Sequence, residues 1–155
     1  MSDTAGPLYA LWLVPADALL DQLRGTVADL ATRFNTPLFG PHSTLCTVEW
    51  SLGLQALQAA MEVLCQGLST LSLSVRGLGQ TDEYFTFFYI KLADDDPQQV
   101  FSRAASAIRG ARSPRIGPHV SLIYSDRIGA IDRVQLAQQL SPILPQRIML
   151  AHLAF

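Results

Sequence analysis

The feature that most constrains this chain is a short phrase that occurs twice, about half the chain apart. Residues 40–45 read Gly-Pro-His-Ser-Thr-Leu, and residues 117–122 read Gly-Pro-His-Val-Ser-Leu. The two histidines, His42 and His119, stand 77 residues apart (119 − 42) in a chain of 155 residues. Internal repetition of this kind predicts a fold made of two similar units that pack together.

The surrounding residues extend the repeat when the sequence is laid on itself with a shift of 77. Apolar stretches at residues 8–14 and 85–91 then coincide, and both read as strands. Residues 17–34 carry apolar side chains at helical spacing, which predicts an amphipathic helix. Its inner positions are Leu20, Leu23, Val27, Leu30 and Phe34.

The image of that helix is expected over residues 97–109. Asp96 fits the N-cap and Pro97 fits the first helical position, where the missing N–H of proline is not needed. Gly110 is expected to end the helix. The expected inner face is Val100, Phe101, Ala104, Ala105 and Ile108.

Both histidine phrases open segments that read as strands, residues 42–50 and 119–124. Gly-Pro precedes each segment, and this pair is typical of a turn or loop rather than of the interior of a helix or strand. A second helix follows each strand, with inner positions at Leu54, Leu57, Met61, Leu64 and Leu68 in the first and at Ile131, Val134, Ala137 and Leu140 in the second. Strands over residues 71–78 and 148–155 complete two β-α-β-α-β units.

The predicted fold is therefore α+β, a single domain of residues 1–155 made of two related halves, about 8–78 and 84–155. With 49% hydrophobic and 15% charged residues, a chain of this length can bury one shared core, and no polar linker divides it. The cysteines, Cys46 on a strand and Cys65 on a helix, are expected to be buried thiols rather than a disulfide or a metal site.

The start of the chain and its charge limit the classes of protein to consider. Pro15 and Asp17 interrupt the first apolar stretch, so a run of about 18 apolar residues does not form and a membrane span is not expected. Asp3, with no basic residue ahead of the apolar segment, argues against a secretory signal, and we expect a cytoplasmic protein. A net charge of −2 is not the basic footprint of a protein that grips long nucleic acid.

The residue types in the two phrases suit acid–base chemistry on a phosphoryl group. In a strand, positions i and i+2 project from one face, so His42 lies beside Thr44 and His119 lies beside Ser121. An imidazole titrates near neutral pH and can give or take a proton, and a hydroxyl can donate to an anionic oxygen. Two such pairs that face each other would clamp a phosphoryl group.

The doubled His-x-Ser/Thr motif is accompanied by Leu-Trp-Leu-Val-Pro ending at Pro15 and Phe-Gly-Pro-His-Ser-Thr-Leu ending at Leu45. Over nearly its whole length the chain resembles the 2H phosphoesterase superfamily, and within it the small cyclic phosphodiesterases. The resemblance implies a two-lobed, pseudo-twofold fold with antiparallel-rich sheets lining a central cleft and helices outside. It also implies that the cleft needs no metal and no cofactor and is lined by His42, Thr44, His119 and Ser121.

The same resemblance implies the hydrolysis of ribose cyclic phosphates, namely ADP-ribose 1″,2″-cyclic phosphate and nucleoside 2′,3′-cyclic phosphates, the latter opened to the 2′-phosphate. Such a ring opens when a water is activated on one side of phosphorus and the leaving oxygen is protonated on the other. By resemblance, His119 is the base and His42 the acid. Thr44 and Ser121 would hold the non-bridging oxygens. The expected partner is a small-molecule substrate, and we expect a monomer.

Further candidates flank the motifs. Trp12 is expected either to stack on a nucleobase of the substrate or to pack in the core. Tyr124 ends the second motif strand and could flank the cleft mouth and bind substrate, although strict alternation would turn it away from the face of His119. His152 has no hydroxyl two residues later and is expected to be structural. Four aromatic residues in one strand are expected to lie mostly in the core: Phe85, Phe87, Phe88 and Tyr89.

A local cationic group precedes the second phrase, at Arg109, Arg112 and Arg115. It forms either an ordinary solvated loop or a small electropositive lip that steers an anionic substrate toward His119.

Two other functions stay open at this point. One is an RNA-end enzyme of the ligase-like branch of the superfamily, which would act on 2′,3′-cyclic ends or 2′-5′ linkages; the acidic charge balance disfavours it. The other is a non-catalytic module that binds phosphorylated nucleotides, and the presence of all four motif side chains argues against it.

Overall fold

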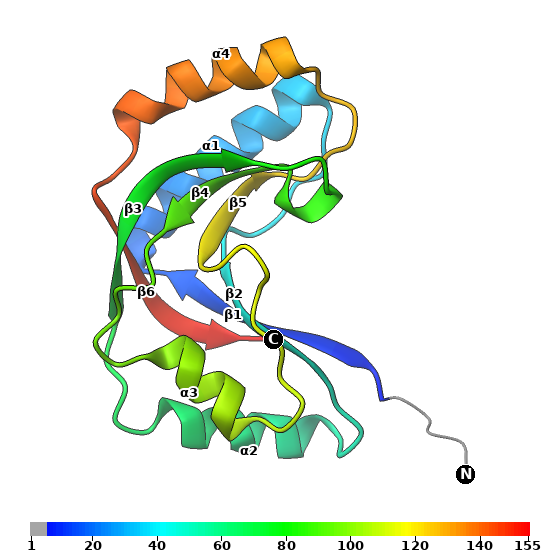
Figure 1. Ribbon diagram of the computed structural model, residues 1–155, viewed down its shortest axis with the longest axis vertical. Coiled ribbons are helices and arrows are strands. Elements are labelled where there is room, and N and C mark those ends of the chain that lie inside the picture. The colour runs from blue at the N-terminus through cyan, green and yellow to red at the C-terminus, as the bar shows by residue number, and fades with distance from the viewer. Residues whose placement is uncertain (1–5) are drawn as a thin grey trace.

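The computed structural model describes residues 6–155 (Figure 1). Asp3, which carried the argument on a secretory signal, lies outside these residues. The described residues form an α+β structure of six strands, four α-helices and two short 3-10 helices. In chain order the elements are β1 (Leu8–Pro15), α1 (Asp17–Phe34), β2 (Ser43–Glu49), α2 (Leu54–Cys65), β3 (Leu71–Gln80), η1 (Tyr84–Thr86), β4 (Phe88–Leu92), α3 (Val100–Ala107), β5 (His119–Ile123), α4 (Ala130–Leu140), η2 (Ser141–Ile143) and β6 (Arg147–Ala154).

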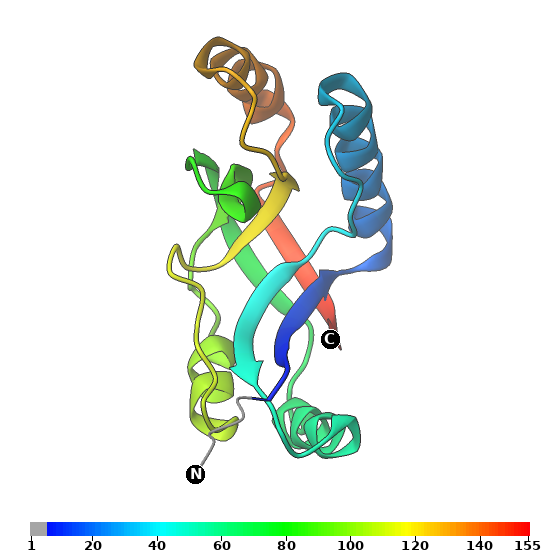
Figure 2. The ribbon, with the colours of Figure 1, turned by 90° about the vertical axis from the view of Figure 1, so that its right-hand side faces the viewer.

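The strands form one sheet in the order β2-β1-β6-β3-β4-β5, and every neighbouring pair is antiparallel. The central strands β3 and β6 bury Leu73, Ile148 and Leu150, which belong to the same apolar core as residues from all four helices. Figures 1 and 2 show that α1 and α4 lie toward one end of the long axis, and that α2 and α3 lie toward the other.

The sheet is strongly curved, as shown by the contact between its two edge strands, β2 and β5. The segment between α3 and β5 joins the two edges. Arg112 in this segment donates its N–H to the carbonyl of Thr47 on β2 over 2.8 Å and accepts from the N–H of Thr47 over 2.9 Å. The curvature turns one face of β1 and β2 toward one face of β5.

Helix α1 has the predicted bounds, and four of its five predicted inner residues are buried: Leu20, Leu23, Val27 and Leu30. It ends where Asn35 adopts the left-handed conformation (φ 51°) and donates its N–H to the carbonyl of Ala31. The helix contacts both β1 and β5. It therefore packs against the strand that carries the second histidine phrase, far away in the sequence.

Helix α3 is shorter than the prediction at both ends. Gln99 adopts a left-handed conformation (φ 52°), so the helix starts at Val100 rather than at Pro97. Asp96 nevertheless caps the chain here, because its carboxylate accepts from the N–H of Gln98 (2.9 Å) and of Val100 (2.8 Å). The prediction of Ala105 as an inner residue was wrong, since that residue is exposed, while the other four predicted inner residues are buried.

The predicted inner face of α4 was right for Ala137 and Leu140, which are partly buried against the core, and wrong for Ile131 and Val134. Ile131 and Val134 are 75% and 53% exposed, and the buried residue of the helix is Leu136. A charged residue of the same helix, Arg133, packs inward instead: its guanidinium lies 4.9 Å from the centre of the Phe87 ring and pairs with Asp82 over 3.2 Å. Arg133 therefore lies on the inner face together with Leu136, Ala137 and Leu140, because its long side chain packs on an aromatic ring while its charged end pairs with a carboxylate.

The second predicted helix of the first half, α2, buries three of its five expected positions; Leu54 is exposed, and Leu68 follows the end of the helix. Cys46 is buried as predicted, whereas Cys65 is exposed at the end of α2, so the prediction of two buried thiols was wrong for Cys65. Neither cysteine forms a disulfide within residues 6–155. In the described part of the chain, no helix is both long enough and apolar enough to cross a membrane.

Candidate functional site

The curved sheet encloses a cleft with a volume of about 640 Å³. Its walls come from β1 and β2 on one side and from η1, β5 and the segment before β5 on the other. The structure brings together in this cleft all six site residues predicted from the sequence: Trp12, His42, Thr44, His119, Ser121 and Tyr124.

The two histidines are held by the same hydrogen bond. The Nδ1 of His42 lies 2.7 Å from the carbonyl oxygen of Gly40, and the Nδ1 of His119 lies 2.9 Å from the carbonyl oxygen of Gly117. A carbonyl oxygen can only accept, so Nδ1 must carry the hydrogen in each ring. The neutral form of each histidine therefore keeps its lone pair on Nε2, and the cationic form donates from Nε2.

The local backbone explains how each Gly-Pro-His phrase produces this bond. The glycine whose carbonyl accepts lies two residues before the histidine. The residue between them is proline, whose ring fixes its own φ angle. Gly117 adopts φ 76°, a conformation that favours glycine, and its N–H donates to the carbonyl of Pro114 over 3.3 Å in a tight turn. His42 lies just before β2, one residue outside the strand that the sequence predicted to begin there.

The two hydroxyls lie two residues beyond the histidines, and both line the cleft. Across the sheet, Thr44 pairs with Trp12 and Ser121 pairs with Tyr89. The hydroxyl of Ser121 donates to the carbonyl oxygen of Phe85 over 2.9 Å. Ser121 therefore has a protein partner that must be given up before the hydroxyl can donate to a ligand.

Trp12 is a cleft residue that contacts a histidine. Its ring stacks on His42 with a centroid separation of 3.9 Å and an interplanar angle of 19°. It is 37% exposed, which argues against the alternative that Trp12 packs in the core. The indole therefore covers one face of the imidazole and fixes the ring plane together with the bond to Gly40.

Sequence reasoning missed a second aromatic contact, between Tyr89 and His119. The two rings meet edge to face at a centroid separation of 5.3 Å and an angle of 65°. Tyr89 is buried, as predicted, and it packs over Gly79 on β3, where an added Cβ would lie 2.5 Å from the tyrosine ring. The signal was present in the sequence, because Tyr89 stands 77 residues after Trp12 (89 − 12).

Three aromatic rings form a cluster at another part of the cleft lining. Phe39 stacks on Tyr124 at 3.8 Å and 16°, and Phe85 meets Tyr124 edge to face at 5.3 Å and 79°. Tyr124 follows the last residue of β5, so the alternation that would have turned it away no longer applies there. The prediction of Phe85 as a core residue was wrong. It is 68% exposed, because residues 84–86 form η1 rather than the start of the strand.

Burial is the main influence on the titration of the cleft. It lowers the pKa of both His42 and His119 below the usual value of 6.5, while the hydrogen bonds to Gly40 and Gly117 act in the opposite direction. A charge on His119 further lowers the pKa of His42. Burial raises the pKa of Tyr124 to about 12, so its hydroxyl stays neutral. Both histidines thus tend toward the neutral form, which is the form able to accept a proton.

The remaining predicted residues lie apart from the cleft or at its rim. Of the three arginines, Arg115 lines the cleft, whereas Arg112 lies 3.8 Å from Glu49 in an exposed ion pair outside the lining. His152 is exposed on β6, with its Nε2 3.7 Å from the carboxylate of Asp17. Residues 6–155 contain no group of three or more His, Cys, Asp or Glu side chains placed to hold a metal ion.

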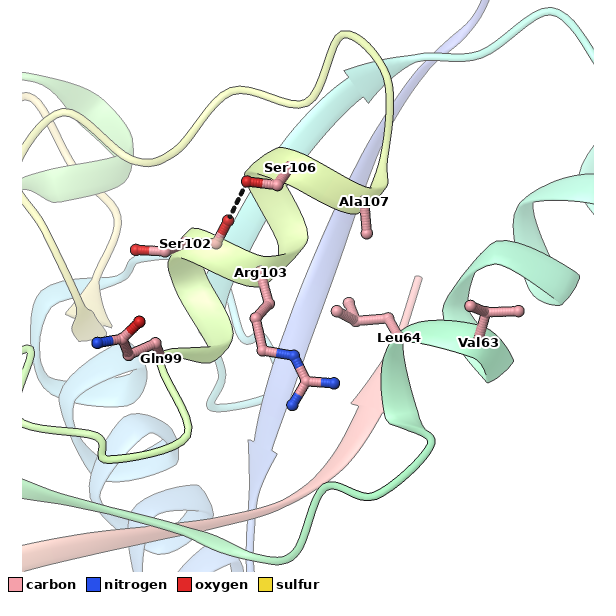
Figure 3. A pocket seen from close by; sticks show the side chains of 7 residues that line it. All are labelled: Val63, Leu64, Gln99, Ser102, Arg103, Ser106 and Ala107. Carbon is pink, nitrogen blue, oxygen red and sulfur yellow. Dashed lines mark hydrogen bonds between the residues drawn. The ribbon is translucent and has the colours of Figure 1, made fainter.

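A second hollow lies on the outer surface between α2 and α3 (Figure 3). Figure 3 shows Arg103 and Leu64 beside it, and the hydroxyl of Ser106 donating to the carbonyl of Ser102. Arg103 is the one ionisable side chain among the described residues that line it, and these residues include no acid–base pair. The cleft between the histidines is the candidate functional site, because it brings together both histidines and both motif hydroxyls.

Comparison with known proteins adds no assignment at this point: no protein-family model matches the chain, and no curated protein matches it significantly.

Proposed function

We propose that this chain is a phosphodiesterase that hydrolyses ribose cyclic phosphates to phosphomonoesters, and that it is related to the 2H phosphoesterase superfamily that its motifs resemble. The proposed substrates are nucleoside 2′,3′-cyclic phosphates and ADP-ribose 1″,2″-cyclic phosphate. One observation carries the proposal. Two histidines share one cleft, and each has Nδ1 committed to a carbonyl, which leaves Nε2 for proton transfer.

The proposed reaction uses the two rings in opposite protonation states. The neutral Nε2 of His119 takes a proton from water as the water oxygen attacks phosphorus. The bond from phosphorus to the leaving ribose oxygen breaks, and Nε2–H of His42 supplies the proton that this oxygen gains. His119 ends protonated and His42 ends neutral, so a proton exchange with solvent restores the starting state. The product is a phosphomonoester with a free ribose hydroxyl.

The assignment of base and acid follows the family resemblance, and one contact supports it. The indole face of Trp12 lies against His42, and an aromatic face attracts a cation. His119 has no such stacked ring, because the planes of the His119 and Tyr89 rings are inclined at 65°. The Trp12 contact favours the cationic form of His42, which is the form that an acid needs, and so opposes the burial and the charge on His119 that lower the pKa of His42.

The hydroxyls are proposed to stabilise charge on the non-bridging oxygens. Thr44 lines the cleft beside His42 and is the more direct candidate. Ser121 would first exchange its bond to the carbonyl of Phe85 for one to the phosphoryl oxygen. That exchange reduces its net contribution, because one hydrogen bond is broken for each one formed.

We also propose that the two halves arose as a duplicated, pseudo-twofold pair. Adding 77 to Trp12 and Thr44, which pair across β1 and β2, gives Tyr89 and Ser121, which pair across β4 and β5. A register irregularity separates Leu11 from Trp12, and another separates Phe88 from Tyr89. The strand order supports the same relation. Exchanging β1, β2 and β3 with β4, β5 and β6 gives the same strand order, read from the opposite edge of the sheet.

The ladders nearer the centre of the sheet, β1–β6 and β3–β4, depart from that relation by two residues. In the β1–β6 ladder Leu13 pairs with Leu153, and in the β3–β4 ladder Leu78 pairs with Ile90. Shifting Leu13 by 77 gives Ile90, whereas shifting Leu153 back gives residue 76 instead of 78. The proposed duplication is therefore most regular around the two histidines and less so away from them.

The experiment that tests the function is a turnover panel with the purified full chain. It compares cyclic mononucleotides, ADP-ribose cyclic phosphate and oligonucleotides with a cyclic end, and phosphorus NMR identifies each product. We expect hydrolysis of the small cyclic phosphates, with nucleoside 2′,3′-cyclic phosphates yielding the 2′-phosphate. A 3′-phosphate would require the roles of His42 and His119 to be exchanged. A preference for oligonucleotides would favour the RNA-end enzyme, and binding without turnover would favour the non-catalytic module.

A further inference from the structure

The two histidine walls of the cleft are alike in sequence but differ in charge. Residues 37–42 read Pro-Leu-Phe-Gly-Pro-His, and residues 114–119 read Pro-Arg-Ile-Gly-Pro-His. Phe39 and Ile116 occupy corresponding positions, and both line the cleft. Leu38 and Arg115 also correspond, and of these two only Arg115 is a lining residue. At this position one wall therefore carries a cation, whereas the corresponding residue of the other wall, Leu38, lies outside the cleft lining.

Among the described residues that line the cleft, Arg115 is the one arginine or lysine, and Glu83 is the one carboxylate. Many of the other lining side chains are apolar or aromatic, including Leu8, Phe85 and Ile116. Within the described residues Arg115 takes part in no ion pair, whereas the neighbouring Arg112 pairs with Glu49. Apart from the two histidines, Arg115 is therefore the cationic side chain that the described cleft lining offers to an anionic group.

The backbone that carries Arg115 is held at both ends. On one side, Arg112 makes its two hydrogen bonds to Thr47 of β2. On the other side, Gly117 closes a turn with Pro114, and its carbonyl accepts from Nδ1 of His119. Arg115 is four residues from His119, so their Cα atoms lie at most about 14 Å apart. The guanidinium is thus kept within reach of a ligand that also contacts His119.

We propose that Arg115 binds a second anionic group of the substrate, remote from the reacting phosphorus, and that this contact determines which way the substrate lies in a nearly symmetric cleft. The preferred substrates are then cyclic phosphates whose sugar carries a further phosphate or diphosphate. A planar guanidinium suits this role because it can bind two phosphate oxygens at once. The inference rests on the proposed function, since it concerns selectivity at the same site.

The test compares two substrates that differ only in the second anion: adenosine 2′,3′-cyclic phosphate with a free 5′-hydroxyl and the same compound with a 5′-phosphate. The proteins are the native chain, Arg115→Gln and the matched control Arg112→Gln, which removes the same charge outside the cleft. We expect the native chain to prefer the 5′-phosphorylated substrate. Arg115→Gln should lower kcat/KM for the 5′-phosphorylated substrate about tenfold, mainly by raising KM, because a charge-assisted hydrogen bond to an exposed arginine is lost.

For the substrate without the 5′-phosphate, Arg115→Gln should change kcat/KM by less than about twofold, and Arg112→Gln should leave the preference between the two substrates unchanged. An equal loss on both substrates would overturn the inference, because Arg115 would then act through the turn that supports His119. Equal use of both substrates by the native chain would also overturn it, while leaving the proposed hydrolysis intact.

Calorimetric binding separates the failure of this inference from a failure of the proposed function. The ligands are adenosine 2′-phosphate and adenosine 2′,5′-bisphosphate, which require no turnover. Tighter binding of the bisphosphate that disappears in Arg115→Gln supports the second anion site even if neither cyclic substrate is hydrolysed. Equal affinities of the native chain for the two ligands would overturn the inference even if both substrates are hydrolysed.

Discussion

At the scale of single residues, the two histidines have matching hydrogen bonds but different aromatic neighbours. Trp12 stacks flat on His42, whereas Tyr89 meets His119 at an angle. The stacked ring restricts rotation of His42 about its side-chain bonds, and the bond from Nδ1 to Gly40 restricts it further. Trp12 is therefore a positioning residue for His42 in addition to any contact that it makes with substrate.

We expect Trp12→Ala to lower kcat roughly threefold to tenfold, because an aromatic pair contributes about 0.5–1.5 kcal/mol beyond area burial. Trp12→Phe keeps a stacking ring and should recover most of the loss. Steady-state kinetics with a cyclic phosphate separates kcat from KM. If both variants changed KM alone and by the same factor, Trp12 would serve substrate binding and not the orientation of His42.

The two hydroxyls should contribute unequally. Thr44→Val should lower kcat by about 10²- to 10³-fold, by analogy with removal of one oxyanion donor. Ser121→Ala should cost less in kcat, because Ser121 must first release the carbonyl of Phe85, but it should lower the free energy of unfolding by about 1 kcal/mol. Kinetics and urea denaturation of both variants provide the comparison. A larger kcat loss for Ser121→Ala would contradict this ranking.

At the scale of elements, the placement of His119 depends on β3 as well as on its own strand. Gly79 on β3 leaves room for the ring of Tyr89, which in turn contacts His119. A side chain at residue 79 would collide with a ring that is itself buried. The glycine on one strand thus determines the surroundings of a histidine two strands away.

Gly79→Ala should destabilise the protein by about 1–3 kcal/mol, the usual cost of overpacking, and should lower turnover as Tyr89 shifts. Gly25→Ala is the matched control, because no atom lies within 4 Å of an added Cβ on that helix and alanine favours the helix by up to about 1 kcal/mol. Chemical denaturation and kcat/KM of both variants give the result. Equal stability of the two variants would show that Tyr89 adapts freely.

The elements themselves could largely be predicted from the sequence, because their periodicity is local. The bounds of α1 and the order of strands and helices follow from apolar spacing and from Gly-Pro punctuation. The inward position of Arg133 on α4 could not be predicted this way, because it depends on a contact with Phe87, which is distant in the sequence. Phe85 lies outside the strand predicted for it, because residues 84–86 form a 3-10 helix. The hydroxyl of Ser121 donates to the carbonyl of Phe85 within this helix.

At the scale of the whole molecule, the site forms because the sheet curves enough for its edge strands to meet. The i, i+2 spacing predicted each histidine–hydroxyl pair, and the repeat predicted that there would be two. The contacts Trp12–His42 and Ser121–Phe85 were not predictable, because they depend on strand register and on irregularities in it. Arg115 became the distinctive charge of the cleft only once the segment between α3 and β5 was seen to cross its edge.

Burial of both histidines should make stability depend on pH. Their pKa values in the folded protein lie below the usual 6.5, so the unfolded chain binds more protons as the pH falls through 6.5. The contribution of the two histidines to the free energy of unfolding is therefore constant above about pH 6.5. It is lost progressively as the pH falls below that value. The double variant His42→Asn/His119→Asn should show a smaller fall in melting temperature between pH 7.5 and about 5.5, as measured by calorimetry. An unchanged fall would mean that other groups control acid stability.

The most direct test of the central claim is a double-variant cycle on the hydrolysis of a nucleoside 2′,3′-cyclic phosphate, with EDTA present. His42→Ala and His119→Ala should each lower kcat by about 10²- to 10⁴-fold while circular dichroism shows an intact fold, because each removes one proton-transfer role. The double variant should lose less than the product of the two single losses, since the rings act as a unit. His152→Ala, which alters the exposed histidine outside the cleft, should behave like the native chain. Near-native turnover by either single variant, or strictly multiplicative losses, would contradict a mechanism in which the two histidines act together on one phosphorus.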